Sequence, residues 1–113
     1  MAANNPGAHY KGRSKKWLQA QGHSVADMEL VRTVHTGNGV FHTKRDQWGS
    51  DLAYFDHDTV VFVQVKGGGK PLSTLLREAG KAFAEHRFPN TCRVELHVWR
   101  RLARAPEVFE WPW

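Results

Sequence analysis

Three polar residues on two adjoining segments, Asp51, Gln64 and Lys66, carry the side chains with which this sequence could do chemistry. Asp51 opens the segment "DLAYF", and the other two interrupt the otherwise apolar run "VVFVQVK". Carboxylate and amide oxygens are ligands that suit a hard divalent cation such as Mg²⁺, which also binds phosphate oxygens. A lysine ammonium is a compact charge that can hold an attacking water and offset charge on a pentavalent phosphorane. Together these residue types predict hydrolysis of a phosphodiester.

The segments that carry these residues are expected to form an antiparallel hairpin, because only the turn residues "DHD" (Asp56 to Asp58) separate them. Side chains alternate along a strand, so Gln64 and Lys66 should project to one side. Asp51 begins the first strand and Lys66 ends the second, which places both at the open end of the hairpin. The sequence therefore predicts that the three side chains converge.

Further metal ligands are available near that open end. The backbone carbonyl of Val65 lies within the same reach as the Gln64 amide, and Asp46 stands five residues before Asp51. Asp46 can supply a second negative charge, or it can be a turn residue. Glu29 is a weaker candidate, since it contributes only if its strand faces the site. The predicted metal ligands are thus Asp51, Gln64, Val65 and Asp46.

The rest of the chain predicts an α/β or α+β domain with a mixed central sheet flanked by helices, in the order α-β-β-β-α-β. A helix is expected over 10–21, with Tyr10, Trp17, Leu18 and Ala20 on its buried side and Gly22 as its C-cap. The remaining expected elements are a strand over 23–35 (or a helix there), a turn over 36–39, a strand or loop over 40–48, strands over 51–55 and 59–66, a helix over 71–88, and strands over 92–101 and 107–111. Residues 1–9 are expected to be a flexible lead-in, and 10–113 a single domain.

The composition narrows the class of partner. The 113 residues include 41% hydrophobic and 24% charged residues, as in a soluble globular domain, and the net charge is +5. An excess of basic residues favours a polyanionic partner, with nucleic acid ahead of an acidic membrane.

The single cysteine, Cys92, excludes an internal disulfide and a cysteine-based zinc site. No apolar run reaches membrane-spanning length, so we expect a cytoplasmic protein that does not bind membranes. The candidate phosphate contacts are Lys11, Arg13, Lys15, Lys16, Lys44, Arg45 and Lys70.

The pairing of "GSD", which ends at Asp51, with "QVK" (Gln64 to Lys66) resembles the PD-(D/E)XK nuclease superfamily, in which Gln is a recognised variant of the acid. Within it the chain is most similar to archaeal-type Holliday-junction resolvases and small phage-encoded resolvase-like proteins. Asp46-Gln-Trp-Gly-Ser-Asp51 resembles their Asp-x-x-Gly-x-x-Asp pattern and is one residue shorter. The likeness extends over residues 10–111 and includes the closing "VWRRLARAPEVFEW".

This resemblance implies a restriction-endonuclease-like core and a Mg²⁺-dependent endonuclease, with Mn²⁺ as a substitute, acting on branched DNA in recombination or repair. It also implies a homodimer, for whose interface Trp111 and Trp113 are candidates, and the host cytoplasm as location if the protein is phage-encoded. The expected helix over 10–21 lacks the glutamate that many resolvases carry there. Because Gln64 is neutral, metal affinity then depends on Asp46 or Glu29 joining Asp51.

Other interpretations remain open from the sequence. The chain could be a non-catalytic DNA-binding protein on a nuclease fold, a nicking or repair nuclease with another DNA substrate, or a protein-interaction module with an incidental basic surface. Taken singly, Asp51, Gln64 and Lys66 could each be a polar tip at a sheet edge. Trp48 could stack near DNA, although packing is the favoured role. His35 or His42 could flank the site, with surface or core roles favoured.

Overall fold

The computed structural model describes residues 6–113, apart from the side chains of residues 6–8, 30–32, 34 and 41–45. Its elements in chain order are α1 (Pro6–Ala20), β1 (Val25–Asp27), β2 (Glu29–Thr36), β3 (Gly39–Asp46), β4 (Leu52–Asp56), β5 (Thr59–Gly67), α2 (Leu72–Ala84), β6 (Cys92–Trp99) and β7 (Glu107–Glu110). Five of the strands form one sheet in the order β1-β4-β5-β6-β7. β5 and β6 are parallel, and the other neighbours are antiparallel. The predicted α/β class with a mixed sheet is confirmed.

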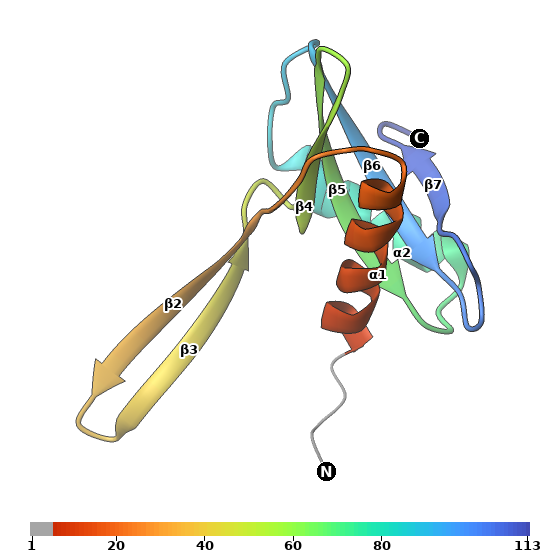
Figure 1. Ribbon diagram of the computed structural model, residues 1–113. Helices are drawn as coiled ribbons and strands as arrows, with labels where there is room; N and C mark the ends of the chain where they lie inside the picture. The colour runs from red at the N-terminus through yellow and green to blue at the C-terminus, as the bar shows by residue number, and fades with distance from the viewer. Residues whose placement is uncertain (1–5) are drawn as a thin grey trace.

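β5 is the centre of the sheet, and its alternating side chains belong to two hydrophobic clusters. Val61, Val63 and Val65 pack in the cluster that contains Leu18 of α1. Phe62 packs in the cluster that contains buried residues of α2. The two helices therefore cover opposite faces of the sheet, and Figure 1 shows α1 in front of it. Such a strand, apolar on both faces, is what the β-branched run of β5 favours.

The expected single strand over 23–35 is wrong, because the chain leaves the main sheet at Met28. β1 pairs with β4, whereas β2 pairs with β3 in a separate two-stranded sheet. The Met28 backbone bridges the break: its N–H donates to the carbonyl of Asp51, and its carbonyl accepts from Gln47 N–H. The β2–β3 hairpin projects from the rest of the molecule as an arm (Figure 1). Segment 40–48, expected as strand or loop, supplies residues 40–46 of its second strand.

Helix α1 begins at Pro6, earlier than expected, so residues 6–9 of the expected lead-in are helical. Gly22 follows the helix with φ of +91°, as the predicted C-cap requires. The predicted burial of Ala20 is wrong: it is exposed, while Ser14 is fully buried. Ser14 and Leu18 lie one helical turn apart, and that spacing places both on the face that contacts the sheet.

Helix α2 ends at Ala84 rather than at residue 88, and β6 ends at Trp99. Within residues 6–113, neither helix is long and apolar enough to cross a membrane.

Candidate functional site

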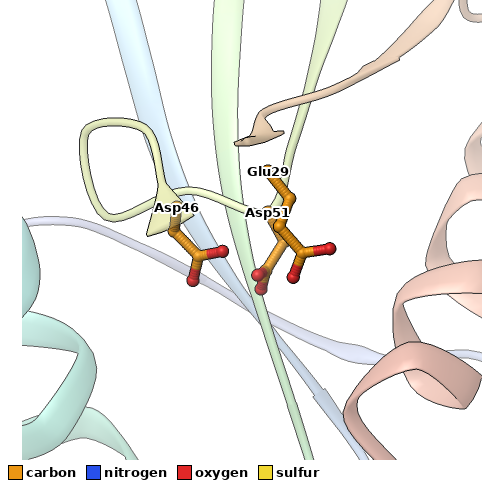
Figure 2. Close-up of side chains that lie close together, drawn as sticks. All are labelled: Glu29, Asp46 and Asp51. Carbon is orange, nitrogen blue, oxygen red and sulfur yellow. The ribbon is translucent and has the colours of Figure 1, made fainter. Parts of the chain in front are cut away.

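Three carboxylates, those of Glu29, Asp46 and Asp51, meet at the base of the β2–β3 arm, and we call them the carboxylate cluster. One oxygen from each lies within 4.8 Å of the others. Glu29 begins β2 and Asp46 ends β3, and the two are register partners. Asp51 comes directly before β4. Figure 2 shows the three side chains converging beside the central strands, with Asp46 on the side of α2 and Glu29 on the side of α1.

Asp51 is held against β5 by two hydrogen bonds. Its N–H donates to the carbonyl of Val63 at 2.8 Å, and its Oδ2 accepts from Val65 N–H at 2.7 Å. The side chain thus takes the place of a backbone acceptor for β5 just before β4 begins. This contact fixes the carboxylate beside the Gln64-Val65-Lys66 segment.

Burial raises the pKa of Asp51 to about 7, against the opposing effect of the Val65 hydrogen bond. The nearby carboxylates of Asp46 and Glu29 raise it further, because a second negative charge is unfavourable beside the first. At neutral pH, full ionisation of all three carboxylates is therefore unfavourable. A proton relieves the repulsion, and so does a bound cation.

Lys11 supplies positive charge on the α1 side of the cluster. Its Nζ lies 3.1 Å from Glu29 Oε2 and 3.2 Å from Asp27 Oδ1. Burial lowers the pKa of Lys11, but the hydrogen bonds to the two carboxylates outweigh this and leave its pKa above the ordinary value. Lys11, predicted to contact phosphate, is thus engaged in ion pairs that join α1 to β1 and β2.

Gln64 and Lys66 lie on the face of β5 that packs towards α2. Gln64 is 7% exposed, and its Oε1 is buried without a hydrogen-bond partner among the described residues. Lys66 Nζ lies 3.8 Å from Glu78 Oε2 on α2. The structure thus brings Asp51 to the backbone of Val65 and to Asp46 and Glu29, and it holds the Lys66 ammonium beside Glu78.

The other predicted phosphate contacts divide between paired and exposed residues. Arg13 lies over the Trp99 ring, 4.4 Å from its centroid, and donates to the carbonyl of Ala103. Lys15 pairs with Asp27 at 3.4 Å, and Lys70 pairs with Glu78 at 3.1 Å. Lys16 is exposed at the rim of a cleft of about 310 Å³ that Arg13, Trp17, Trp99 and Arg104 also line. The side chains of Lys44, Arg45 and His42 lie outside the described part of the structure.

Glu29, the weaker candidate metal ligand from the sequence, is a full member of the cluster. The "TGNG" turn indicates its position. Thr36 pairs with Gly39, and counting outward along an unbroken ladder brings Glu29 opposite Asp46. The same counting from the His57–Asp58 turn brings Asp51 opposite Gln64, one step beyond the pair Leu52 and Val63.

Four other residues lie outside the carboxylate cluster: Gly67, the two dimer-interface candidates Trp111 and Trp113, and His35. A Cβ on Gly67 would overlap the Tyr10 ring, so this glycine allows α1 to pack closely on β5. Trp111 and Trp113 pack against each other and against Phe83, and Trp113 remains 43% exposed. His35 is exposed on the arm, away from the cluster at its base.

A scan against models of known protein families finds no match for this chain, and a search of curated proteins finds no relative.

Proposed function

We propose that this protein is a metal-dependent endonuclease that hydrolyses DNA phosphodiester bonds on a restriction-endonuclease-like core of the PD-(D/E)XK type. The observation that carries the proposal is the carboxylate cluster, positioned by Asp51 against the strand that carries Gln64 and Lys66. Mg²⁺ is the proposed cofactor, with Mn²⁺ as a substitute. Branched DNA such as a four-way junction is the proposed substrate.

The donor set fits a hard divalent cation. Glu29, Asp46 and Asp51 offer three carboxylates, and such cations prefer oxygen ligands. The buried Gln64 Oε1 lacks a hydrogen-bond partner among the described residues, which supports a role as a neutral ligand. An ion held there would lower the pKa of a bound water and offset charge on a phosphate. Three carboxylates provide more negative charge for Mg²⁺ than Asp51 alone, so the low metal affinity expected of a single carboxylate does not apply.

The protein residues have separate tasks in this proposal. The Val65 N–H orients Asp51, and Lys11 limits the negative charge of Glu29 on the side of α1. Lys66 holds the attacking water. Its ion pair with Glu78 is long and partly exposed, and pairs of this kind contribute little stability, so the ammonium can leave it.

The element order supports the same proposal. In the main sheet, an antiparallel run of β1, β4 and β5 is followed by the crossover through α2 to the parallel strand β6. Without the arm and β7 this is the α-β-β-β-α-β order. The net charge of +5 suits a DNA backbone. A homodimer is the proposed assembly, because a four-way junction offers two symmetric cutting positions.

The first prediction concerns cleavage of a synthetic four-way junction and its linear control with Mg²⁺. Asp51→Asn should lower the cleavage rate on the order of 100-fold or more, because it removes a ligand charge at the reacting phosphate. Asp58→Asn is the matched control, since Asp58 is exposed in the β4–β5 turn. Both variants should bind DNA as the wild type does.

Equal cleavage by Asp51→Asn and wild type would contradict the site assignment. Salt-sensitive DNA binding without cleavage in either metal would favour a non-catalytic DNA-binding protein. Preference for a linear or flapped substrate would favour a nicking or repair nuclease, and absence of DNA binding at low salt would favour a protein-interaction module.

A further inference from the structure

The turn between β3 and β4 presents a tryptophan in a conformation that tryptophan rarely adopts. Trp48 has φ of +53° and Gly49 has φ of +67°, both in the left-handed region. A bridge between Gln47 and Ser50 closes the turn, and Ser50 N–H donates to the Gln47 carbonyl at 3.0 Å. Glycine and asparagine are the usual residues at such positions, and bulky side chains there are outliers. The backbone is therefore strained at Trp48.

This strain does not bury the indole. Trp48 is 50% exposed, and it contacts Phe62 edge to face with the ring centroids 5.3 Å apart. A tryptophan that only filled the core would be more completely covered. Strained residues of this kind cluster at binding and catalytic sites, where the surrounding structure holds them in place.

Two cavities flank the indole. One, of about 470 Å³, is lined by Asp46, Trp48, Glu85 and His86 among others, so it adjoins the carboxylate cluster through Asp46. The second, of about 310 Å³, has aromatic walls from Trp48, Phe62 and Phe88 and shares His86 with the first. Both volumes lie in the range of small-molecule sites and exceed the size of a single planar ring system.

The lining indicates the chemistry of the occupant. Glu85, which is outside the carboxylate cluster, places a carboxylate at the first cavity, and its charge repels a phosphate there but not an uncharged ring. The aromatic walls favour a flat π-system, and His86 and Gln47 offer polar groups to its edge. Aromatic side chains stack on nucleobases without regard to sequence.

We propose that the cavities beside Trp48 bind an unpaired nucleobase, from a nucleotide next to the phosphate held at the carboxylate cluster. This inference rests on the proposed function, because the cluster defines where that phosphate lies. A nucleobase site beside Trp48 would favour binding of branched or distorted DNA over a regular duplex. A base at a branch point is already partly unstacked, so turning it into a pocket costs less there than within a regular duplex.

The test measures binding without cleavage, with Ca²⁺ in place of Mg²⁺. The probe is a DNA duplex with one unpaired 2-aminopurine, a fluorescent base whose emission reports stacking, and a fully paired duplex is the comparison. Trp48→Ala should weaken binding of the unpaired-base duplex by about tenfold or more and leave the paired duplex nearly unchanged. Trp48→Phe should retain most of the affinity.

Two further variants keep the result interpretable. Trp48→Asn should lose the same affinity while remaining folded, because asparagine tolerates the left-handed backbone that the turn requires. Phe55→Ala is the matched control, since Phe55 is also an exposed aromatic residue and lines neither cavity.

The inference is overturned if Trp48→Ala and Trp48→Asn bind the unpaired-base duplex as tightly as the wild type, even if the protein cuts junctions. It is also overturned if they lose affinity for both duplexes equally. If the Trp48 variants lose affinity only for the unpaired-base duplex, but Asp51→Asn cleaves DNA as fast as the wild type, the nucleobase site is upheld and the catalytic proposal is wrong. If the wild type binds neither duplex, both the nucleobase site and the proposed nuclease function are overturned.

Discussion

At the scale of single residues, the carboxylate cluster is a site where charge repulsion opposes folding. Asp51 is half-buried beside Asp46 and Glu29, and its Oδ2 accepts a hydrogen bond from the Val65 N–H. Burial is the largest cause of the raised pKa of Asp51, which lies near 7. Charged groups gathered in this way destabilise a metal-free fold, and a bound cation reverses that effect by mass action.

The second prediction follows from this pKa and concerns stability in EDTA. Between about pH 4 and pH 7 the folded protein keeps a proton on Asp51 that the unfolded chain has released. The folded state therefore binds more protons, and this group lowers the free energy of unfolding as pH rises through that window. Asp51→Asn keeps an acceptor for Val65 N–H but removes the charge. From pH 5 to pH 8, the stability of Asp51→Asn relative to wild type should rise by about 1 kcal/mol or more, since each pKa unit corresponds to about 1.4 kcal/mol.

Urea unfolding of wild type, Asp51→Asn and the control Asp58→Asn at both pH values measures this difference. Adding Mg²⁺ at pH 8 should stabilise the wild type more than Asp51→Asn. Parallel pH dependence of wild type and Asp51→Asn would show that Asp51 titrates normally and is not buried against its neighbours.

At the scale of elements, a buried polar network fixes α1 on the sheet. Trp99 Nε1 donates to Ser14 Oγ at 2.6 Å, and Ser14 Oγ lies 3.2 Å from His97 Nδ1. His97 Nε2 lies 3.3 Å from Glu95 Oε1, which also accepts from the Tyr54 hydroxyl at 2.8 Å. Burial alone would raise the pKa of Glu95, but the hydrogen bonds from His97 and Tyr54 bring it below its ordinary value. Because α1 carries Lys11, this network also positions the counter-charge of the cluster.

The third prediction is that Ser14→Ala lowers the free energy of unfolding by about 1–3 kcal/mol, because it leaves the Trp99 N–H and the His97 ring nitrogen buried without their partner. Denaturant unfolding at neutral pH measures the change. Ser24→Ala is the control, since Ser24 is exposed between α1 and β1. A cost for Ser14→Ala no larger than that of Ser24→Ala would mean that water or a rearranged side chain satisfies the network.

At the scale of the whole molecule, the β2–β3 arm and the five-stranded sheet are distinct units that meet at the carboxylate cluster. The arm is a two-stranded sheet of its own, and Figure 1 shows it extending away from the helices. The cluster lies where the arm joins the sheet, with two acids from the last pair of the arm and one from the segment before β4. The Glu29–Asp46 register pair is the only part of the arm that contributes to the cluster.

The fourth prediction is that the arm can be shortened without loss of the proposed metal binding at the carboxylate cluster. Removing residues 31–34 and 41–44 deletes four residues from each strand, so the Glu29–Asp46 pair and the alternation of side chains are preserved. The main sheet should unfold at nearly the same urea concentration, and Mg²⁺ should stabilise the shortened protein as much as the full chain.

The control is the shortened protein with Asp51→Asn, in which the stabilisation by Mg²⁺ should be lost. If the shortened protein with Asp51 intact already lacks that stabilisation, the outer part of the arm is required to hold the cluster.

The sequence by itself determined the features that depend on residues close together in the chain. Two short turns set the registers of two hairpins, and these registers place Glu29 opposite Asp46 and Asp51 level with Gln64. The β-branched run of β5 favours a strand buried on both faces, and Gly22 predicted the end of α1. Local turn geometry and side-chain alternation are sufficient for such features.

Only the tertiary structure decided which charges meet across elements distant in sequence. The break at Met28 separated the arm from the main sheet. Packing of the helices against the sheet formed the ion pairs of Lys11 with Glu29 and of Lys66 with Glu78. Helical periodicity identifies a buried face but not its partners, so Ser14 and its contacts with Trp99 and His97 could not be foreseen. These pairings depend on how the helices are placed against the sheet, and that placement is set by the packing of the whole core.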